Sequence, residues 1–550
     1  IDQQIVEQTE ESLKTLNAES TDFGYRVAVT EFDSLEEFIA AIGGEERLSE
    51  EYKQFRDQLT GFEPNHDFRL TDTIEIDLKN TSINLRPYQR GGIHWLDWLR
   101  RSYLHGVLAD DMGLGKTLQA VCTLRMGYEH TGNNQPSLIV CPRSVITHWD
   151  RELRRFFPQS RPYRYHGSQR ELSVFYSTVP YIGITTYETL TNDIEHLSRL
   201  NFFYVILDEA TYIKNPNAKR TQAIKKLNAT HRLALSGTPV ENSPSELWSI
   251  FDFLLPGHLG KYYTFKRVFE DKIASRESSA TVRLGRKIRP FILRRLKEDV
   301  AKDLPKKIEI DEWCSLTEEQ KQIYGAIQGR YKHVGEALRR GENVNILPLL
   351  TKLKQTCDHP RIITKDARPL HNRSNKFDWV VDKIEEIANL EQQVVVFTHF
   401  LDMLSLLESA LVERKISFIR IDGSTTNRQE LIDDFNSGQS TSALCSIKAV
   451  AHGINLTSAN HVIHADRWWN PAVEDQATDR VHRIGQEQTV YVYRILTEGT
   501  LEERIDRLLE SKRDLADQII GATVKGTRKW TRAELLEILR PLDEFEDDSY

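Results

Sequence analysis

The chain has few cysteines, and no two of them lie close together in the sequence. Its five cysteines (Cys122, Cys141, Cys314, Cys357 and Cys445) stand far apart without a Cys-x-x-Cys motif. This spacing argues against a disulfide framework and a zinc knuckle, and it favours a reducing compartment. No apolar run approaches the roughly 18 residues that span a bilayer, and the first residues lack the basic and then apolar layout of a signal peptide. We therefore expect neither a membrane partner nor bound zinc.

Glycine and proline are also too scarce for a collagen-like or low-complexity chain, with 28 Gly and 18 Pro among 550 residues. The fractions of hydrophobic (39%) and charged (28%) residues are those of a globular protein. A chain of this length exceeds one hydrophobic core, and about 150 residues per domain predicts three or four folding units.

Basic residues are scarce at both ends of the chain. Residues 1–80 hold 7 Lys and Arg against 20 Asp and Glu, and residues 541–550 hold five acids and no base. Because the whole chain has a net charge of −8, the middle is net positive. A basic middle suits a polyanionic partner. The acidic ends either compete for that partner or are solvated helix faces.

The apolar pattern divides the chain. From residue 85, short β-branched runs alternate with longer amphipathic segments, which predicts a doubly wound α/β domain with a parallel sheet. Residues 257–390 read as charged and helical, and the α/β pattern returns at 394–496. We therefore predict two α/β lobes separated by a helical insertion.

The strongest local motif is VLADDMGLGKT at 107–117, in which an apolar strand leads through a glycine loop to a helix. Phosphates need a concave set of backbone N–H groups, a point cation and a hydroxyl for magnesium. Gly113 and Gly115, followed by Lys116 and Thr117, supply these groups. The general phosphate-loop pattern has glycine at position 110, where this chain has Asp110.

Two further strands end in polar residues. VILDEA at 205–210 places Asp208 and Glu209 at a strand end, where they can hold magnesium and polarise an attacking water. SGTP at 236–239 ends a third strand with hydroxyls placed to sense the nucleotide.

The segment QATDRVHRIGQ at 476–486 predicts a helix with Arg480 and Arg483 on one face. Such a pair either meets the charge developing on a γ-phosphate or forms a surface salt-bridge face. Since 367 residues separate Lys116 from Arg483, one lobe cannot supply both. A shared ATP would lie between lobes or between subunits.

Taken together and in order, these motifs resemble the Swi/Snf-type ATPases of helicase superfamily two, which translocate on double-stranded DNA. The resemblance covers about residues 85 to 520. It rests on LRPYQ (85–89), DDMGLGKT (110–117), LIVCPRSVITHWDREL (138–153), ITTYETL (184–190), DEATYIKNP (208–216), LSGTPVENSPSELWSIFDFLLPG (235–257), LKQTCDHP (353–360), VVVFTHF (394–400), IDGST (421–425), GINLTSANHVIHADRWWNPAVEDQATDRVHRIGQ (453–486) and EGTLEERI (498–505).

The resemblance implies two RecA-like doubly wound lobes with helical insertions. It divides the chain into an acidic N-terminal helical segment (1–80), an ATP-binding lobe 1 (81–260), helical protrusions with a connector (261–370), lobe 2 (371–510), and a C-terminal helical brace with an acidic tail (511–550).

The resemblance also implies roles for single residues. Gln89 would contact adenine. Asp111, Gly113, Gly115, Lys116 and Thr117 would form the phosphate site, with Thr117 and Asp208 on magnesium. Lobe 2 would supply Gln476, Arg480 and Arg483. The residues expected to face DNA are Arg143, Ser144, Trp149, Thr185, Thr186, Tyr187, Thr398, His399 and Ser446.

Three further features concern aromatic packing, metal binding and coupling. Trp468 and Trp469 are either a base-stacking pair or packing residues, and we favour packing. Cys357 and His359 lack a second ligand pair nearby, so we predict a packed turn rather than a metal site. Val450 and Ala451 stand where the family usually has two glycines, which puts the coupling of ATP to movement in doubt.

The expected function is a DNA-dependent ATPase that uses ATP and Mg²⁺ to translocate on double-stranded DNA and to remodel or displace a DNA-bound protein. The alternatives are a strand-separating helicase and a DNA-binding scaffold with impaired ATPase. We expect a monomer. The short insertion resembles prokaryotic members, which predicts a cytoplasmic location on the nucleoid, with a nuclear location if the source is eukaryotic.

Overall fold

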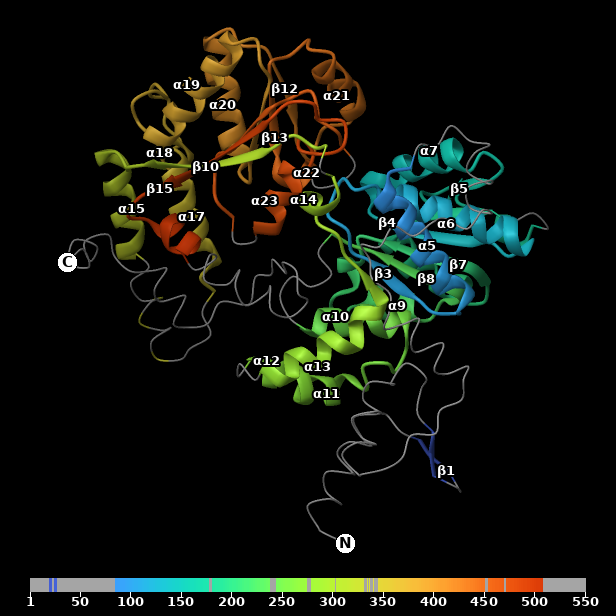
Figure 1. The fold of residues 1–550 in the computed structure, drawn as a ribbon. Coiled ribbons are helices and arrows are strands. Elements are labelled where there is room, and N and C mark those ends of the chain that lie inside the picture. Colours follow the sequence, from blue (N-terminus) through green and yellow to red (C-terminus); the bar gives the residue numbers. More distant parts are fainter. Residues whose placement is uncertain are drawn as a thin grey trace. The chain divides into compact units, whose positions relative to one another are not determined.

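The structure is a computed structural model (Figure 1). It describes residues 19–21, 24–26, 85–177, 181–237, 244–274, 278–301, 303–330, 334, 336, 340, 345–450, 454–468 and 471–507. The chain divides into two compact units, one ending at Val300 and the other beginning at Ala301, with short C-terminal stretches assigned to each. We call them lobe 1 and lobe 2.

Lobe 1 is built on a seven-stranded parallel sheet. Its strand order is β5-β6-β4-β7-β8-β3-β9. The strands are β3 (Gly106–Leu108), β4 (Ser137–Cys141), β5 (Pro162–Arg164), β6 (Ile182–Thr186), β7 (Asn201–Asp208), β8 (Asn228–Leu235) and β9 (Ile292–Leu293). Every residue of β3, β4 and β6 is buried. Strands covered on both faces have continuous apolar runs, which explains the texture of the sequence.

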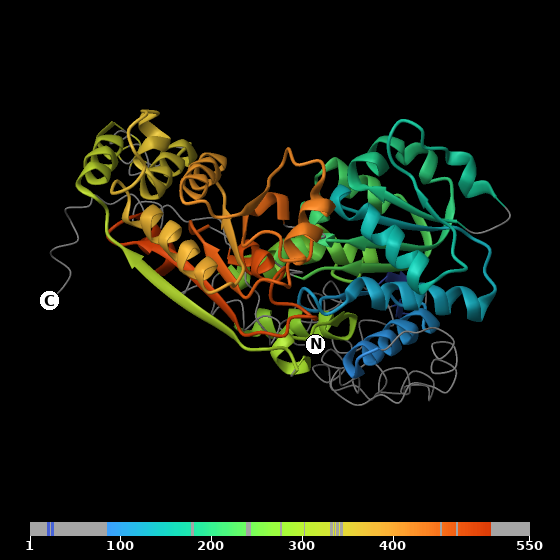
Figure 2. The same cartoon turned by 90° about the horizontal axis from the view of Figure 1, so that it is seen from above.

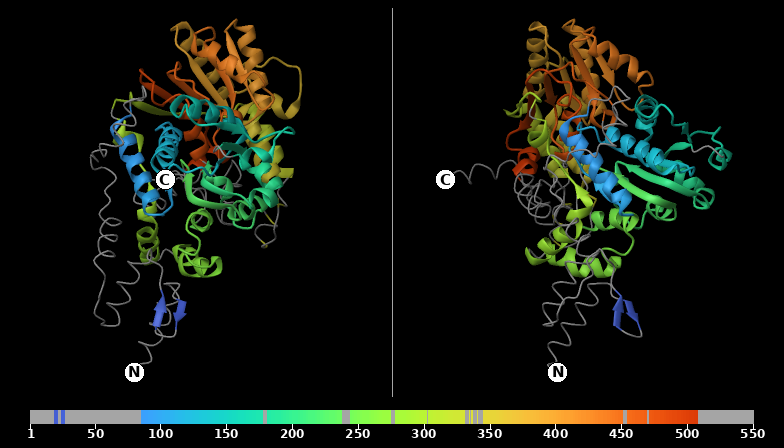
Figure 3. Two further views of the ribbon diagram at one scale, coloured as in Figure 1. Left: turned by 90° about the vertical axis from the view of Figure 1, so that its right-hand side faces the viewer. Right: turned by 45° about the vertical axis from the view of Figure 1, so that its right-hand side comes forward.

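The helices of lobe 1 cover this sheet and lead into the connector. They are α5 (Pro87–Arg101), α6 (Lys116–Thr131), α7 (Ile146–Phe156), α8 (Tyr187–Leu197), α9 (Lys219–Lys225), α10 (Pro244–Leu254), α11 (Tyr262–Phe265), α12 (Asp271–Ala274), α13 (Ser278–Ile288) and α14 (Lys297–Val300), with 3₁₀ turns η2 (Arg143–Val145), η3 (Leu172–Tyr176), η4 (Ala210–Ile213) and η6 (Arg289–Phe291) and a π-helical turn η5 (Lys266–Glu270). Helices α5 and α6 lie side by side (Figure 3).

Lobe 2 is built on a six-stranded parallel sheet with the order β10-β15-β14-β11-β13-β12. Its elements are β10 (Lys307–Cys314), α15 (Glu318–Arg330), α17 (Leu347–Asp358), α18 (Pro360–Thr364), α19 (Asn375–Asn389), β11 (Val394–Thr398), α20 (Leu401–Glu413), β12 (Phe418–Ile421), α21 (Arg428–Asn436), β13 (Ser442–Ser446), α22 (Ile447–Val450), β14 (His461–His464), α23 (Pro471–Thr478) and β15 (Val490–Thr497).

Successive residues of β11 face opposite sides of this sheet. Val394 and Val396 belong to one apolar cluster, together with residues of α19 and α20. Val395 and Phe397 belong to another, together with residues of α21. Helices flank the strands on both sides (Figure 2). The prediction of two doubly wound α/β lobes is therefore confirmed.

The predicted helical insertion at 261–370 needs correction, because both sheets draw a strand from it. β9 pairs with β3 at one edge of the lobe 1 sheet, and β10 pairs with β15 at one edge of the lobe 2 sheet. β9 has two residues, too few for the alternation typical of a strand to be visible in the sequence. β10 is an edge strand in which residues 307–311 alternate charged and apolar side chains, and charged residues are common on exposed edges.

Little of the predicted terminal segments is described. Residues 1–80 are described only at β1 (Glu19–Thr21) and β2 (Gly24–Arg26), which form an antiparallel hairpin rather than a helix. The helices expected within 31–60 and the brace expected at 511–550 lie outside the described residues. Among the residues that are described, no helix combines the length and apolar character needed to span a membrane.

Candidate nucleotide site

The loop between β3 and α6 has the backbone shape of a phosphate site. Gly113 and Gly115 have φ of +83° and +80°, in the left-handed region that glycine enters without strain. A Cβ on Gly115 would lie 2.6 Å from Nε2 of Gln89, so a side chain at this position would displace the Gln89 amide. No side chain of the described part of the lobe caps the start of α6, so its first N–H groups can receive an anion.

Lys116 lies over this loop. Its Nζ donates to the carbonyl oxygens of Asp110 (2.7 Å) and Asp111 (3.3 Å). A Cβ placed on Gly237 of the SGTP motif would be 3.8 Å from the same Nζ. The ammonium group therefore marks where two of the predicted motifs meet, a position suited to an anionic ligand.

Strand register explains this meeting. Leu235 of β8 is paired with Leu108 of β3 on one side and with Asp208 of β7 on the other. The loops that follow these three strands consequently start next to one another at the carboxyl edge of the sheet, where ligands of open α/β sheets bind.

The two acids at the end of β7 are held by neighbouring side chains. Asp208 accepts hydrogen bonds from the indole N–H of Trp149 (Nε1–Oδ2, 2.7 Å) and from the backbone N–H of Glu209 (3.0 Å). The hydroxyl of Tyr187 donates to the carbonyl oxygen of Asp208 (2.7 Å). Glu209 has a φ of +53°, an uncommon conformation for a side-chain-bearing residue that turns the chain sharply at this point. Both acids are partly exposed.

Gln89 joins α5 to the phosphate loop. Its Nε2 donates to the carbonyl oxygen of Leu114 (3.2 Å), and its Oε1 accepts from the backbone N–H of Arg86 (3.0 Å). Contact with adenine stays a prediction. Asp111 accepts from the backbone N–H of Lys297 (3.0 Å), so part of its carboxylate serves the protein rather than a nucleotide.

These residues fit MgATP. The loop amides and Lys116 suit the phosphates, and Thr117 and Asp208 are oxygen donors of the type that Mg²⁺ prefers. Among the described residues, no group of three or more His, Cys, Asp or Glu is arranged to hold a metal ion. A magnesium ion here would thus take its other ligands from phosphate and water, as is usual for this metal.

Of the residues predicted to face DNA, only two have exposed side chains. Arg143 and Ser144 lie on the turn η2 that precedes α7, and both are exposed. The others are buried: Trp149, Thr185, Thr186, Tyr187, Thr398, His399 and Ser446. Trp149 and Tyr187 pack behind Asp208. We therefore correct their role from DNA contact to support of the site.

His399 and Thr398 are held inside lobe 2 by Asp466. Nδ1 of His399 donates to Oδ1 of Asp466 (2.6 Å), and the Thr398 hydroxyl bonds to its Oδ2. Burial, opposed by Asp466, lowers the pKa of His399. The ring of Trp468 stacks on the ring of His399 with centroids 3.9 Å apart. Trp468 is thus a packing residue, as predicted, and Trp469 lies outside the described residues.

The prediction that Arg480 and Arg483 share one helix face is wrong. Helix α23 ends at Thr478, and both arginines lie in the turns that follow. The backbone N–H of Arg483 bonds to Val481 two residues back, which is not a helical pattern. Arg480 is buried, Arg483 is half-buried, and Gln476 is half-buried on α23. Their roles at the γ-phosphate stay predictions.

Cys357 and His359 form the predicted packed turn. Nε2 of His359 bonds to the carbonyl oxygen of Leu370 (2.9 Å), and its Nδ1 accepts from the backbone N–H of Arg361 (3.0 Å), so both ring nitrogens are used. Burial raises the pKa of the Cys357 thiol well above its usual range. The other unusual position, Val450 and Ala451, has no described side chains.

Sequence reasoning missed Arg295, which is buried and forms an ion pair with Asp110. The sequence signal that could have indicated it is Asp110, which is charged where the general phosphate loop has glycine. A buried carboxylate at that position requires a cationic partner.

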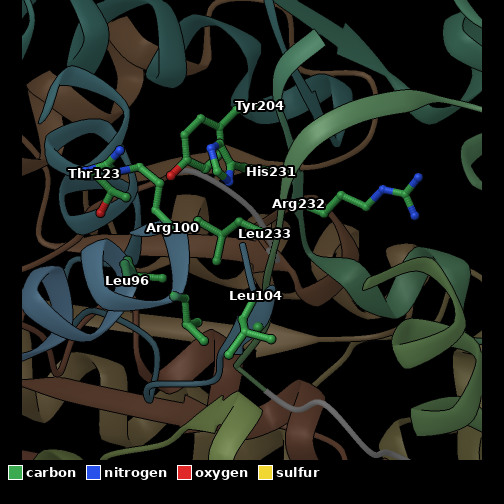
Figure 4. Close-up of a pocket in the computed structure, with 10 residues that line it drawn as sticks. Leu96, Arg100, Leu104, Thr123, Tyr204, His231, Arg232 and Leu233 are labelled. Atoms are coloured by element: carbon green, nitrogen blue, oxygen red, sulfur yellow. The ribbon is translucent and has the colours of Figure 1, made fainter. Parts of the chain in front are cut away.

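A pocket elsewhere in lobe 1 is not the nucleotide site (Figure 4). It lies near the amino end of β3 and the middle of β8, and its lining includes Leu96, Arg100, Tyr204 and His231. Its cavity of about 10 Å³ has room for about one water molecule. Arg232 extends away from it, and its Nη1 donates to the carbonyl oxygen of Phe253 (2.6 Å).

Comparison with protein families finds two matches in tandem. The SNF2-related domain matches residues 88–362, and the helicase conserved C-terminal domain matches residues 375–485. The chain belongs to the SNF2 family. Its matched regions are the domains of SNF2-type ATP-dependent helicases, in the order in which the motifs predicted them.

Curated SNF2-family relatives are longer than this chain. A putative ATP-dependent helicase/translocase of Bacillus subtilis, YwqA, is 39% identical over 449 residues, which are 79% of this chain and 49% of the relative. The TATA-binding protein-associated factor MOT1 of Saccharomyces cerevisiae is 33% identical over 534 residues, covering 83% of this chain and 28% of the relative. The chain thus spans about half or less of the length of the relatives it matches.

A solved structure is also similar in sequence. The Sulfolobus solfataricus SWI2/SNF2 ATPase core in complex with dsDNA is 37% identical, with coverage of 84% of this chain and 97% of that one and a TM-score of 0.42.

Proposed function

We propose that this chain is a DNA-dependent ATPase that translocates on double-stranded DNA and displaces or remodels DNA-bound protein without separating the strands. The observation that carries the proposal is the meeting of Lys116, the Asp208–Glu209 pair and the SGTP motif at one edge of the lobe 1 sheet. Membership of the SNF2 family supports the use of ATP.

The residues divide the chemistry among them. Lys116 and the N–H groups of the loop neutralise and orient the phosphates. Thr117 and Asp208 would hold Mg²⁺, which neutralises charge that develops on the phosphates. Glu209 orients the attacking water and accepts its proton. Trp149 and Tyr187 keep Asp208 in place.

Movement on duplex DNA is the finer part of the proposal. Exposed Arg143 and Ser144 precede α7, and α7 carries Trp149, whose indole bonds to Asp208. A phosphate backbone bound at η2 would therefore be two contacts away from the catalytic acids. Relatives named for helicase or translocase activity and for association with the TATA-binding protein support a role on DNA that carries bound protein. We further propose that the protein acts on chromosomal DNA, on the nucleoid in a prokaryotic cell or in the nucleus of a eukaryotic cell.

The first test measures ATP hydrolysis by the full chain with no DNA, with single-stranded DNA and with duplex DNA. Duplex DNA should stimulate hydrolysis, and Lys116→Ala should reduce the stimulated rate by about 100-fold or more. Removal of Mg²⁺ with a chelator should abolish it. Equal stimulation by single strands alone would favour a strand-separating helicase, and DNA binding without hydrolysis would favour a scaffold.

Displacement of the third strand from a DNA triplex tests movement directly. The wild type should displace it only with ATP, and Lys116→Ala should not. Hydrolysis without displacement would contradict translocation while leaving the ATPase in place.

A further inference from the structure

A buried ion pair fixes the phosphate loop from a distant part of lobe 1. Arg295 is 3% exposed and Asp110 is fully buried. The guanidinium meets the carboxylate with two N–H groups, Nε to Oδ1 (2.8 Å) and Nη2 to Oδ2 (2.5 Å). Gln119 of α6 completes the cluster, accepting from Nη2 of Arg295 (2.8 Å) and donating to Oδ2 of Asp110 (3.1 Å).

The same guanidinium reaches the helix that bears Gln89. Its Nη1 donates to the carbonyl oxygen of Tyr88, and its carbon lies 5.3 Å from the centre of the Tyr88 ring. The Tyr88 hydroxyl in turn donates to the carbonyl oxygen of Leu114 in the phosphate loop (3.1 Å). Arg295 therefore links the loop, α5 and α6 through one planar group. A guanidinium donates several hydrogen bonds in fixed directions, so it fixes the relative positions of its partners better than a lysine ammonium would.

The backbone beside Arg295 runs along the loop as well. The N–H of Ala109 bonds to the carbonyl oxygen of Leu293 (2.7 Å), and the N–H of Asp111 bonds to that of Arg295 (3.0 Å). This segment continues through α14 to Val300, where lobe 1 ends and the chain passes into lobe 2. The segment that fixes the loop thus leads directly into lobe 2.

We propose that Arg295 is a positioning residue for the nucleotide. It holds the phosphate loop and α5 in a fixed position relative to each other, so that nucleotide affinity depends on residues 292–297. The inference rests on the proposed function, because it takes ATP and ADP as the ligands of this loop. Arg295 itself is committed to protein partners and does not bind phosphate.

Gly92 provides an independent probe of this cluster. A Cβ on Gly92 would lie 1.9 Å from Oε1 of Gln119 and 2.7 Å from Nη2 of Arg295, which is too close for either atom to stay. The preceding residue on the same helix, Gly91, would meet nothing within 4 Å. Alanine at either position raises helix propensity equally. Gly91→Ala is therefore a matched control for Gly92→Ala, which pushes the cluster apart.

The first measurement is a calorimetric titration of the full chain with MgADP in the absence of DNA. The second measures KM and kcat for duplex-stimulated ATP hydrolysis. Gly91→Ala should bind MgADP within twofold of the wild type. Gly92→Ala and Arg295→Lys should bind at least tenfold more weakly and raise KM for ATP more than they lower kcat. Arg295→Lys keeps the charge and adds no volume, so it provides the test even if Gly92→Ala does not fold.

Equal affinity of Gly91→Ala and Gly92→Ala, or unchanged affinity of Arg295→Lys, would overturn the positioning role. A lowered thermal midpoint with unchanged affinity would do the same, because it would show a purely structural cluster. If the wild type neither binds MgADP nor hydrolyses ATP, the proposed function and this inference both fail. If the wild type does both and the variants match it, only this inference fails.

Discussion

At the scale of single residues, buried side chains set the geometry of the exposed ones. Asp208 faces the nucleotide site, yet its carboxylate is held by Trp149, which is fully buried. One hydrogen bond of this kind contributes about 1 kcal/mol to stability, but its larger effect is to fix where the carboxylate oxygens lie.

Trp149→Phe tests this point, because it removes the N–H and keeps an aromatic ring. We expect the duplex-stimulated kcat to fall about tenfold, with a loss of about 1 kcal/mol in the free energy of unfolding. Trp248→Phe is the control. It removes the indole bond to the carbonyl oxygen of Gly260 (2.9 Å), also in lobe 1. It should cost similar stability and leave kcat unchanged. Equal kcat in both variants would contradict the role of Trp149.

Buried His258 gives a pH dependence of stability. Its Nε2 donates to the carbonyl oxygen of Lys287 (2.9 Å), and burial lowers its pKa to about 4. In the unfolded chain the His258 imidazole is protonated below about pH 6.5, whereas in the folded lobe it stays neutral down to about pH 4. The free energy of unfolding therefore falls as the pH drops from about 6.5 toward 4.

Between pH 7.5 and 5.5, this one histidine should cost about 1 kcal/mol of unfolding free energy. Urea unfolding of the wild type and His258→Gln at the two pH values measures it. The variant should lose about 1 kcal/mol less on acidification, whatever its own stability at pH 7.5. An identical loss would show that His258 is not the titrating group.

At the scale of elements, a buried lysine joins the helices of lobe 2. Lys376 of α19 donates to Glu502 (Nζ–Oε2, 2.6 Å) and lies 3.7 Å from Asp358 at the end of α17. All three side chains are buried. Within the described residues neither carboxylate oxygen of Asp358 has a hydrogen-bond partner, and burial raises its pKa well above the usual range.

Lys376→Met would leave Glu502 buried without its cation. Removal of one member of a buried ion pair costs about 3–5 kcal/mol, and we expect a loss of that size in urea unfolding of lobe 2. The control is Lys321→Met, which breaks an exposed pair with Glu318 on α15 and should cost less than about 1 kcal/mol. Similar losses in both variants would show that the buried cluster has no special role.

At the scale of the whole molecule, charge is distributed unevenly along the chain. The acidic residues 1–80 precede the basic middle. An acidic segment near the basic middle would compete with a polyanion for it. We expect deletion of residues 1–80 to strengthen duplex binding several-fold at about 50 mM salt, with the difference vanishing at high salt, since screening removes it. Fluorescence anisotropy with labelled duplex measures this. Unchanged or weaker binding at low salt would show that the segment does not shield the DNA path.

The sequence by itself determined the fold class and the nucleotide motifs. A buried parallel strand reads as a short apolar run, and the polar residues of a phosphate site follow such strands directly in the chain. Lys116, Thr117, Asp208 and Glu209 could therefore be named from local pattern alone, as could the packed turn at His359.

Only the tertiary structure decided which side chains are buried and which distant residues meet. It moved Trp149 and Tyr187 from the surface to the support of Asp208, placed Arg480 and Arg483 after the end of a helix, and brought Arg295 to Asp110. The reason is physical. Periodicity shows which face of an element is apolar, whereas the packing of separate elements decides the partner of a buried charge. Arg295 and Asp110 are 185 positions apart in the sequence.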